Sequence, residues 1–443
     1  MSDVSAADSP GRPSNVRWGI FTLACGTSWL LYFHRYMFAL IKPDLKKEWE
    51  LGSDDLGLID SIFSITYTGF QVPLGITADV VGVRIVLTLL ILGWSASLGL
   101  HALAPNFKVL AVARGALGIT QSAAYACLNR ISKSWFPQSI RTSLQGWIGV
   151  FFGRIGGFSA NIIFGAVLMG AFGFGWRPLI LAFSAMGVMY ALVFWMVFRN
   201  SPHLHPWSNA AEVKLVEGAT TDEPAEPPPR MTMSEMLSGM SGRSIANLLA
   251  LNVQTILSTA ADNLYSNWIP LFLAEVYLFG AEERGWMSAL PLLGGAIGGA
   301  LGGILNDVLM RGIGNRCWGR RIVGLCGKGT AAILLLIGLL VFDHPYLFCT
   351  LLFFVKFFSD SGLSTTWGTV TDIGGEATAT VFAFNNAVAG IGSMVAPLLY
   401  GYIAEKYSWQ EVFLTAAGFY ALCALSWLAI NCTIPIVAED DES

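Results

Sequence analysis

Two arginines lie inside apolar stretches of this chain, where charged residues are rare. The stretch LLYFHRYMFAL, residues 30–40, contains Arg35, and Arg114 lies in an apolar segment near residues 108–131. An arginine within a membrane span costs about 2.5 to 3.5 kcal/mol on insertion scales, so we expect each one to face a wet cavity or an ion partner. Because a planar guanidinium binds a carboxylate through two parallel hydrogen bonds, two of them indicate a site for an organic anion.

The two arginines are expected at one depth in the membrane. Arg35 lies about eighteen residues into its segment and Arg114 about six residues into an oppositely directed one, which at 1.5 Å per residue places both in the outer third of a bilayer. Tyr32 precedes Arg35 by three residues and so shares its helix face, where its hydroxyl could contact a polyol or a carboxylate. For each arginine the alternatives are snorkelling to the surface and a buried ion pair.

Carboxylates and further cations also lie within apolar segments. Asp262 is about seventeen residues into its segment, near the level of the two arginines, and Asp360 lies in the middle of another segment. Each carboxylate is either a titrating site or the counter-ion of a buried cation. Lys356 and Asp360 are spaced i, i+4, which favours a local ion pair over a binding site. Two roles stay open for Arg154, a third contact to the anion and an ion pair.

Composition places these residues in an integral membrane protein. Of the 443 residues 54% are hydrophobic and 13% are charged, with a mean hydropathy of +0.58, whereas a soluble protein is about 25% charged. The net charge of −4 gives no basic face for nucleic acid. The seven cysteines are scattered, with no CxxC pair and no histidine at metal-ligand spacing, so we expect no metal and no other cofactor.

Twelve apolar segments are long enough to cross about 30 Å of hydrocarbon as helices. They lie near residues 17–41, 57–78, 83–104, 108–131, 141–169, 176–199, 245–275, 284–308, 320–341, 345–371, 378–403 and 410–433. A stretch rich in Pro, Glu and Thr separates the first six from the last six and is expected to be a linker that does not fully fold. The predicted domains are an N-terminal tail (1–16), a six-helix bundle (17–199), the linker (200–243), a second six-helix bundle (244–433) and an acidic tail (434–443).

Lysine and arginine are unevenly distributed between the two sets of loops. If the N-terminus is cytoplasmic, fourteen of them lie inside and seven, including Lys42, lie outside. The positive-inside rule therefore places the linker and both termini in the cytoplasm. We expect a monomeric, multi-pass protein of the plasma membrane.

Two similar motifs mark the two halves as a repeat. GITADVVGVR follows the second segment and contains Gly75, Asp79, Gly82 and Arg84, and GGILNDVLMR follows the eighth segment and contains Asp307. The first motif resembles the major facilitator signature Gly-x-x-x-Asp-x-x-Gly-x-Arg. This resemblance covers nearly the whole chain and implies an all-α membrane fold of twelve transmembrane helices in two pseudo-symmetric six-helix bundles. It also implies that these five residues act as a gate, holding the cytoplasmic ends of the halves together when the protein opens outward.

Several shorter segments resemble the anion:cation symporters within that superfamily. They are the Tyr-x-x-Arg of YFHR, NRISKSWFPQSIR, GNRCWGRR, TTWGTVTDIGG and FNNAVAGIG. The resemblance implies that Arg35 and Arg114 bind an organic anion, and that Asn385 contacts the substrate. We expect Tyr32 and Gln121 to orient it. An interhelical hydrogen bond is the alternative role for Asn385.

Uptake of an anion against an inside-negative potential of about 100 mV costs about 2.3 kcal/mol per charge, so it needs a companion cation. The symporters that this chain resembles carry one acidic residue before the first-helix arginine and another in the fourth helix; here His34 and Gln121 occupy those places. A histidine titrates near neutral pH. The candidate proton sites are therefore His34, Asp262 and Asp360, while a neutral, hydrogen-bonded His34 is the alternative.

The sequence thus predicts a secondary transporter that moves a small organic anion, a sugar acid or another carboxylate, by alternating access with a co-transported proton. The first segment also resembles organophosphate:phosphate antiporters, but those carry a second substrate arginine where this chain has Asp262. That exchanger and a sensor that does not translocate are the alternatives. An enzyme is not expected, because HExxH, GxSxG and Walker A motifs are absent from the sequence.

Overall fold

The computed structural model describes residues 12–217, 240–374 and 378–434, and within these ranges the regular elements are all helices. The first half contains α1 (Val16–Trp49), α2 (Ser53–Val81), α3 (Val83–Leu103), α4 (Phe107–Gln121), α5 (Ala124–Trp135), α6 (Gln138–Gly146), η1 (Trp147–Phe151), α7 (Phe152–Ser159), η2 (Ala160–Ala171) and α8 (Trp176–Val197). The described start of the linker contains η3 (Pro202–Leu204) and α9 (Ala210–Glu217). The second half contains α11 (Gly242–Asn267), α12 (Ile269–Glu275), α13 (Ala281–Ile313), α14 (Arg316–Leu340), α15 (Pro345–Ser361), α16 (Leu363–Gly374), α17 (Thr378–Lys406) and α18 (Trp409–Ala429).

Consecutive helices combine into twelve membrane-crossing segments, six in each half. The pairs α4–α5, α11–α12 and α15–α16 each form one broken crossing, and α6, η1, α7 and η2 together form another. In the described part of the chain, nine helices are long and apolar enough to cross a membrane by length and composition alone. The predicted all-α fold of two six-helix bundles is confirmed.

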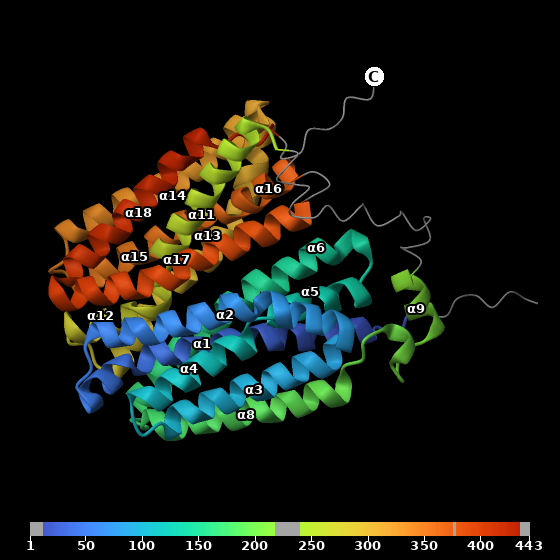
Figure 1. Ribbon diagram of the computed structural model, residues 1–443, viewed down its shortest axis with the longest axis horizontal. Helices are drawn as coiled ribbons and strands as arrows, with labels where there is room; N and C mark the ends of the chain where they lie inside the picture. Colours follow the sequence, from blue (N-terminus) through green and yellow to red (C-terminus); the bar gives the residue numbers. More distant parts are fainter. Residues whose placement is uncertain (1–11, 218–239, 375–377, 435–443) are drawn as a thin grey trace, which may run out of the picture.

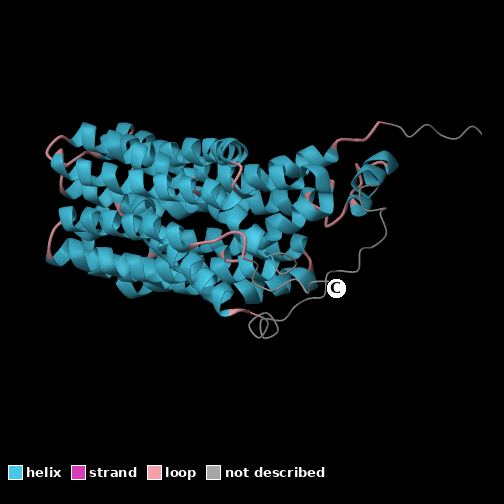
Figure 2. Ribbon diagram, turned by 90° about the horizontal axis from the view of Figure 1, so that it is seen from above, coloured by secondary structure: helices cyan, strands magenta, loops and turns pink. Residues whose placement is uncertain are grey.

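The two halves form separate bundles that lie side by side (Figure 1), and the helices of both run along one long axis (Figure 2). Each bundle has its own core. Trp94 and Trp135 are fully buried in the first, and Trp268 and Tyr420 are fully buried in the second. Leu56 of α2 belongs to the buried core of the opposite half, and the partly buried Leu51 packs against the same core. The halves therefore have separate cores and meet along an interface in which α2 lies against α17, and α7 and η2 lie against α13.

The two bundles touch at the end where α1 connects to α2. There α12 packs against α1, α2 lies along α17, and η2 lies along α13. Two glycines allow this close approach: a Cβ at Gly57 would lie 2.4 Å from the carbonyl oxygen of Pro397, and a Cβ at Gly285 would lie 2.3 Å from the amide nitrogen of Ala166. From this end the bundles diverge toward α6 and α16 (Figure 1).

Ion pairs reinforce the closed end. Lys46 of α1 lies 2.8 Å from Glu275 of α12 and 3.4 Å from Glu405 of α17. Glu405 also accepts a 2.7 Å hydrogen bond from the backbone amide of Ser53, the first residue of α2. The second half thus supplies a carboxylate cap to a helix of the first half, where the amide groups of a helix N-terminus favour negative charge.

At the opposite end, the described residues show no hydrogen bond or ion pair between the two bundles. Asp79 of α2 pairs with Arg130 of α5, within the first half, and both side chains remain well exposed. Along the interface, the ion pair between Arg154 and Asp360 is the link farthest from the closed end in the part of the chain that the structure describes.

We expect Glu405→Gln to weaken the closed end. The amide keeps a hydrogen-bond acceptor for Ser53 but loses the charge that favours the helix N-terminus and Lys46. A lost charged cap is worth about 1 kcal/mol, which would shift the balance between closed and open states about fivefold. Spin labels at Glu50→Cys and Gln410→Cys, measured by double electron–electron resonance, should show a larger population of long distances.

The matched control for this prediction is Glu411→Gln. Glu411 is an exposed glutamate near the same end, and its side chain makes no described bond to the first half. It should leave the distance distribution unchanged. Equal distance distributions for the Glu405 and Glu411 variants would show that Glu405 does not help to hold the closed end together.

The described start of the linker is docked onto the first bundle. Glu212 of α9 is fully buried and accepts hydrogen bonds from the backbone amides of Asn15 (2.6 Å) and Arg17 (3.1 Å). Its carboxylate also lies 3.0 Å from the guanidinium of Arg17. Residues 218–239 of the predicted linker lie outside the described residues. The part of the linker before them is therefore attached to the start of α1.

Candidate functional site

Arg35 has no acidic partner among the described residues. Its Nε donates a 3.0 Å hydrogen bond to the side-chain oxygen of Gln121. Three aromatic rings surround its guanidinium, with centroids 5.0 Å away at Tyr32, 5.1 Å at Phe63 and 4.8 Å at Tyr67. Its Nη2 is buried without a hydrogen-bond partner. An arginine held by rings and one amide keeps its charge and spare donors for a ligand.

Arg114 is instead part of a buried ion cluster. Its Nη2 lies 3.2 Å from one oxygen of Asp60, and the other oxygen of Asp60 lies 2.5 Å from Nζ of Lys42. These three side chains are at most 1% exposed. Lys42 also donates a 2.8 Å hydrogen bond to the backbone carbonyl of Asn267 in the second half. The buried ion pair considered as the alternative for Arg114 is thus present in this structure.

The location predicted for Lys42 is wrong. We expected it outside the membrane, after a helix that ends near residue 41, but α1 continues through Pro43 to Trp49. Lys42 therefore lies inside the helix and is fully buried. Asp60 was not among the predicted site residues, although a carboxylate in the apolar run LGLIDSIF was a signal for it. Lys42 must have a partner because it is buried, and Asp60 supplies it.

A second ion cluster lies in the other bundle. Nζ of Lys356 lies 2.7 Å from Asp262 of α11 and 2.9 Å from Asp360 in its own helix, which confirms the predicted i, i+4 pair. Arg154 of α7 reaches across the interface to Asp360, at 2.7 Å. Asp262 is 31% exposed and also accepts a 2.8 Å hydrogen bond from the hydroxyl of Tyr420. Of the two roles left open for Arg154, the structure shows an ion pair.

Arg154 lies in a helix with unusual winding on both sides. Its helix α7 is flanked by the π-helical segments η1 and η2. A π-helix is rare and occurs mostly near functional sites. The wider winding displaces side chains relative to an α-helix, so the direction of Arg154 toward Asp360 depends on these segments.

Two other predicted residues lie in helix contacts. Gln121 is fully buried, and its side-chain nitrogen donates a 3.3 Å hydrogen bond to the carbonyl of Leu31. Asn385 of α17 donates to the side chains of Asn252 (3.1 Å) and Thr255 (3.0 Å) in α11, which is the interhelical hydrogen bond considered as its alternative role.

His34 is fully buried between α1 and α8. A Cβ at Gly187 of α8 would lie 2.8 Å from its ring carbon Cε1, and the backbone of Phe183 in α8 faces the ring. The histidine thus lies inside the first bundle. Both ring nitrogens are buried without a hydrogen-bond partner among the described residues, so the hydrogen bond of the alternative role is not seen.

The predicted gate residues lie at the end where the bundles diverge. Gly82 has φ of 100° between α2 and α3, a backbone conformation that favours glycine. Arg84 donates from its guanidinium to the carbonyl of Trp195 at 2.8 Å. Asp79 pairs within the first half, as described above, and Gly75 lies in α2. The side chain of Asp307 lies outside the described part of the chain. The gate role of these residues stays a prediction.

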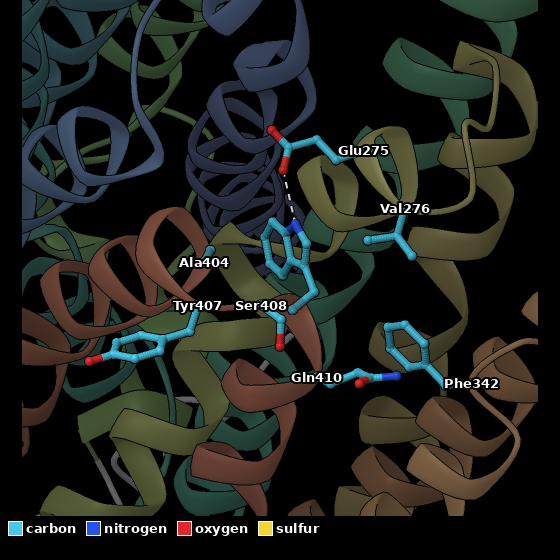
Figure 3. Close-up of a pocket in the computed structure, with 8 residues that line it drawn as sticks. Glu275, Val276, Phe342, Ala404, Tyr407, Ser408 and Gln410 are labelled. Atoms are coloured by element: carbon cyan, nitrogen blue, oxygen red, sulfur yellow. Dashed lines mark hydrogen bonds between the residues drawn. The ribbon is translucent and has the colours of Figure 1, made fainter.

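A surface pocket of about 360 Å³ lies apart from both ion clusters (Figure 3). It opens between α12, α17 and α18, and Glu275 in its wall accepts a 2.9 Å hydrogen bond from the indole of Trp409. Glu275 also pairs with Lys46 at the closed end, so the pocket lies at that end of the protein. In the described residues no group of three or more His, Cys, Asp or Glu could hold a metal ion.

Two helix bundles with charged side chains at mid-membrane along their interface define a polytopic membrane transporter. The family model of the Major Facilitator Superfamily matches residues 24–253 and 251–431. The chain belongs to the major facilitator superfamily, and its members are transporters rather than enzymes.

Several characterised proteins are similar to this chain over nearly its full length. It is 26% identical to a probable sulfoacetate transporter of Cupriavidus necator over 96% of each chain. It is 25% identical to the hexuronate transporter of Escherichia coli K12 over 93% of each chain. The crystal structure of a bacterial homologue of the human lysosomal transporter Spinster, in an inward-facing, unoccupied conformation, superposes with a TM-score of 0.73. That pair is 15% identical, over 94% of this chain and 95% of the other.

Proposed function

We propose that this protein carries a small organic anion across the membrane by alternating access, with Arg35 as the residue that binds the anion. The observation that carries the proposal is the environment of Arg35. Its guanidinium lies within a membrane-crossing helix, contacts three aromatic rings, and has no carboxylate partner among the described residues. A charge in that position is costly unless an anion joins it for part of the cycle.

The relatives support an organic acid as the substrate. They are named for sulfoacetate, D-galactonate and hexuronate, all of which are anions with a carboxylate. In the proposed complex Arg35 binds the carboxylate, Tyr32 contacts the remainder of the substrate, and Gln121 holds the guanidinium in place. Arg114 contributes positive potential, since its own hydrogen bonds go to Asp60. Asn385 keeps its bonds to α11 in this state.

The state of the protein follows from the closed end and the charge distribution. We take the protein to lie in the plasma membrane, and the excess of Lys and Arg on one set of loops favours cytoplasmic termini. The closed end, between α1 and α2, then faces outward, and the bundles diverge toward the cytoplasm. We interpret the structure as an inward-facing state of a monomer.

We propose that the co-transported proton binds at Asp262. Of the two carboxylates around Lys356, Asp262 is 31% exposed whereas Asp360 is 3% exposed, so a proton from solvent reaches Asp262 first. Loss of the negative charge on Asp262 leaves Lys356 paired with Asp360 alone. His34 lies inside the first bundle and is a weaker candidate.

Counterflow in proteoliposomes tests the proposed function. Vesicles that contain the purified protein and unlabelled hexuronate, D-galactonate or sulfoacetate should accumulate the labelled form of at least one of them. Inorganic phosphate should not compete. Competition by phosphate at similar concentration would indicate an organophosphate exchanger, and binding without counterflow would indicate a sensor.

The Asp262→Asn variant should still exchange the anion but should no longer accumulate it in response to a pH difference. A pH difference of one unit supplies about 1.4 kcal/mol per proton, or about tenfold accumulation for one proton per anion. The variant should lose this accumulation and keep counterflow, because the binding arginine is intact. Asp343→Asn, at an exposed aspartate near the start of α15, is the control and should accumulate like the unaltered protein. Undiminished accumulation by Asp262→Asn would exclude it as the proton site.

A further inference from the structure

The interior of the protein contains more positive than negative charge. In the described residues away from the ends of the membrane-crossing segments, there are six cations and three carboxylates. The cations are Arg35, Lys42, Arg114, Arg154, Lys328 and Lys356, and the carboxylates are Asp60, Asp262 and Asp360.

The three carboxylates are already shared among four of the cations. Asp60 serves two of them in the first bundle, and Asp262 and Asp360 serve Lys356 and Arg154. Lys328 is 4% exposed and donates only to hydroxyls, at 2.7 Å to Ser258 and 2.8 Å to Ser359. The four paired cations exceed their three carboxylates by one charge, and Lys328 and Arg35 add one charge each. The excess is therefore three positive charges.

We propose that the transported substrate carries two anionic groups, one bound by Arg35 and the other by Arg154. This inference rests on the proposed function and narrows its substrate class to small dianions. A single carboxylate would neutralise only one of three excess charges, and unneutralised charge in a low-dielectric site costs several kcal/mol. A dianion brings the bound state closer to neutrality.

Arg154 has donors available for a ligand. Its Nη1 lies 2.7 Å from Asp360, but the side chain is 22% exposed. Part of its side chain therefore remains in contact with solvent. Because a guanidinium carries five N–H donors, it can keep Asp360 and bind a second anion. Gly295 lets the Arg154–Asp360 pair pack against α13, since a Cβ there would lie 2.2 Å from an oxygen of Asp360 and 3.1 Å from Nη1 of Arg154.

Tyr32 connects the two proposed anion sites. Its ring centroid lies 5.0 Å from the guanidinium carbon of Arg35. On the other side, a Cβ at Gly153 would lie 3.0 Å from the ring edge of Tyr32, and Gly153 directly precedes Arg154. Tyr32 therefore contacts the guanidinium of Arg35 and also packs against α7, the helix that holds Arg154. A small molecule with an acidic group at each end could contact both arginines and pack against that ring.

Matched ligand pairs test this inference in the full-length protein. Sulfoacetate is compared with its amide, sulfoacetamide, and succinate is compared with its monoamide, succinamate. In each pair the amide has nearly the same shape as the dianion and one negative charge fewer. Ligand-induced shifts of the melting temperature give apparent affinities without requiring transport. We expect at least one dianion to bind about tenfold or more tightly than its amide. Arg154→Gln should reduce that ratio to about one, since Asp360 keeps Lys356 as a partner.

Two further variants control the test. Lys108→Gln removes one positive charge at an exposed position near the start of α4 and should leave the ratio unchanged. Arg154→Lys keeps the charge without the planar fork and should give an intermediate ratio. Equal affinities within each ligand pair, or an unchanged ratio in Arg154→Gln, would overturn the dianion inference while organic anion transport could still stand. If counterflow also fails for every organic anion, the proposed function itself is wrong.

Discussion

Arg35→Lys should reduce uptake of the organic anion to background while the protein remains folded. Lysine keeps the positive charge but loses the planar pair of donors that binds a carboxylate bidentately. It also loses the Nε donor whose hydrogen bond to Gln121 fixes the guanidinium. Charged hydrogen bonds contribute about 1.5 to 3 kcal/mol each, so the affinity for the anion should fall about tenfold to a hundredfold.

Uptake by proteoliposomes and the ligand-induced shift in melting temperature would measure this effect. Arg177→Lys is the matched control, because Arg177 pairs with Glu48 at 2.7 Å near the closed end and lies away from the proposed site. It should transport normally. Unchanged uptake by Arg35→Lys, with protein that elutes as a single species, would remove Arg35 from the binding site.

Asp60→Asn should destabilise the protein more than any other single change discussed above. The variant leaves Lys42 and Arg114 buried without a carboxylate, both at most 1% exposed. Removal of one partner from a buried ion cluster typically costs about 3 to 5 kcal/mol. We expect a large fall in melting temperature and poor recovery of folded protein from the membrane.

Lys42→Gln gives the comparison for that prediction. It leaves Asp60 paired with Arg114 alone, so no buried charge is without a partner. Its melting temperature should stay close to that of the unaltered protein, and the Asp60→Asn, Lys42→Gln double variant should recover part of the loss. If the Asp60→Asn variant melts at the same temperature as the Lys42→Gln variant, Asp60 does not balance the charges of Lys42 and Arg114.

The fold could be predicted from the sequence because each membrane crossing needs about twenty apolar residues, a requirement that leaves a clear pattern. The site could be predicted only in part. Arg35 was singled out because an arginine in an apolar run has few explanations, and its role in binding stays a proposal. Asp360 was considered as a counter-ion of Arg154, and the structure shows that pair. The partner of Arg114 was not found, since Asp60 comes from another helix and its approach depends on packing. Lys42 was misplaced because the apolar run ends near residue 41, whereas α1 continues to Trp49.

The cap that Glu405 provides to α2 has a consequence for how the transport cycle can be observed. While the halves are closed, the amide of Ser53 donates to a carboxylate of the other bundle. When they separate, that amide must exchange its partner for water. Its hydrogen–deuterium exchange rate therefore reports the fraction of time that this end of the protein is open, without any substitution.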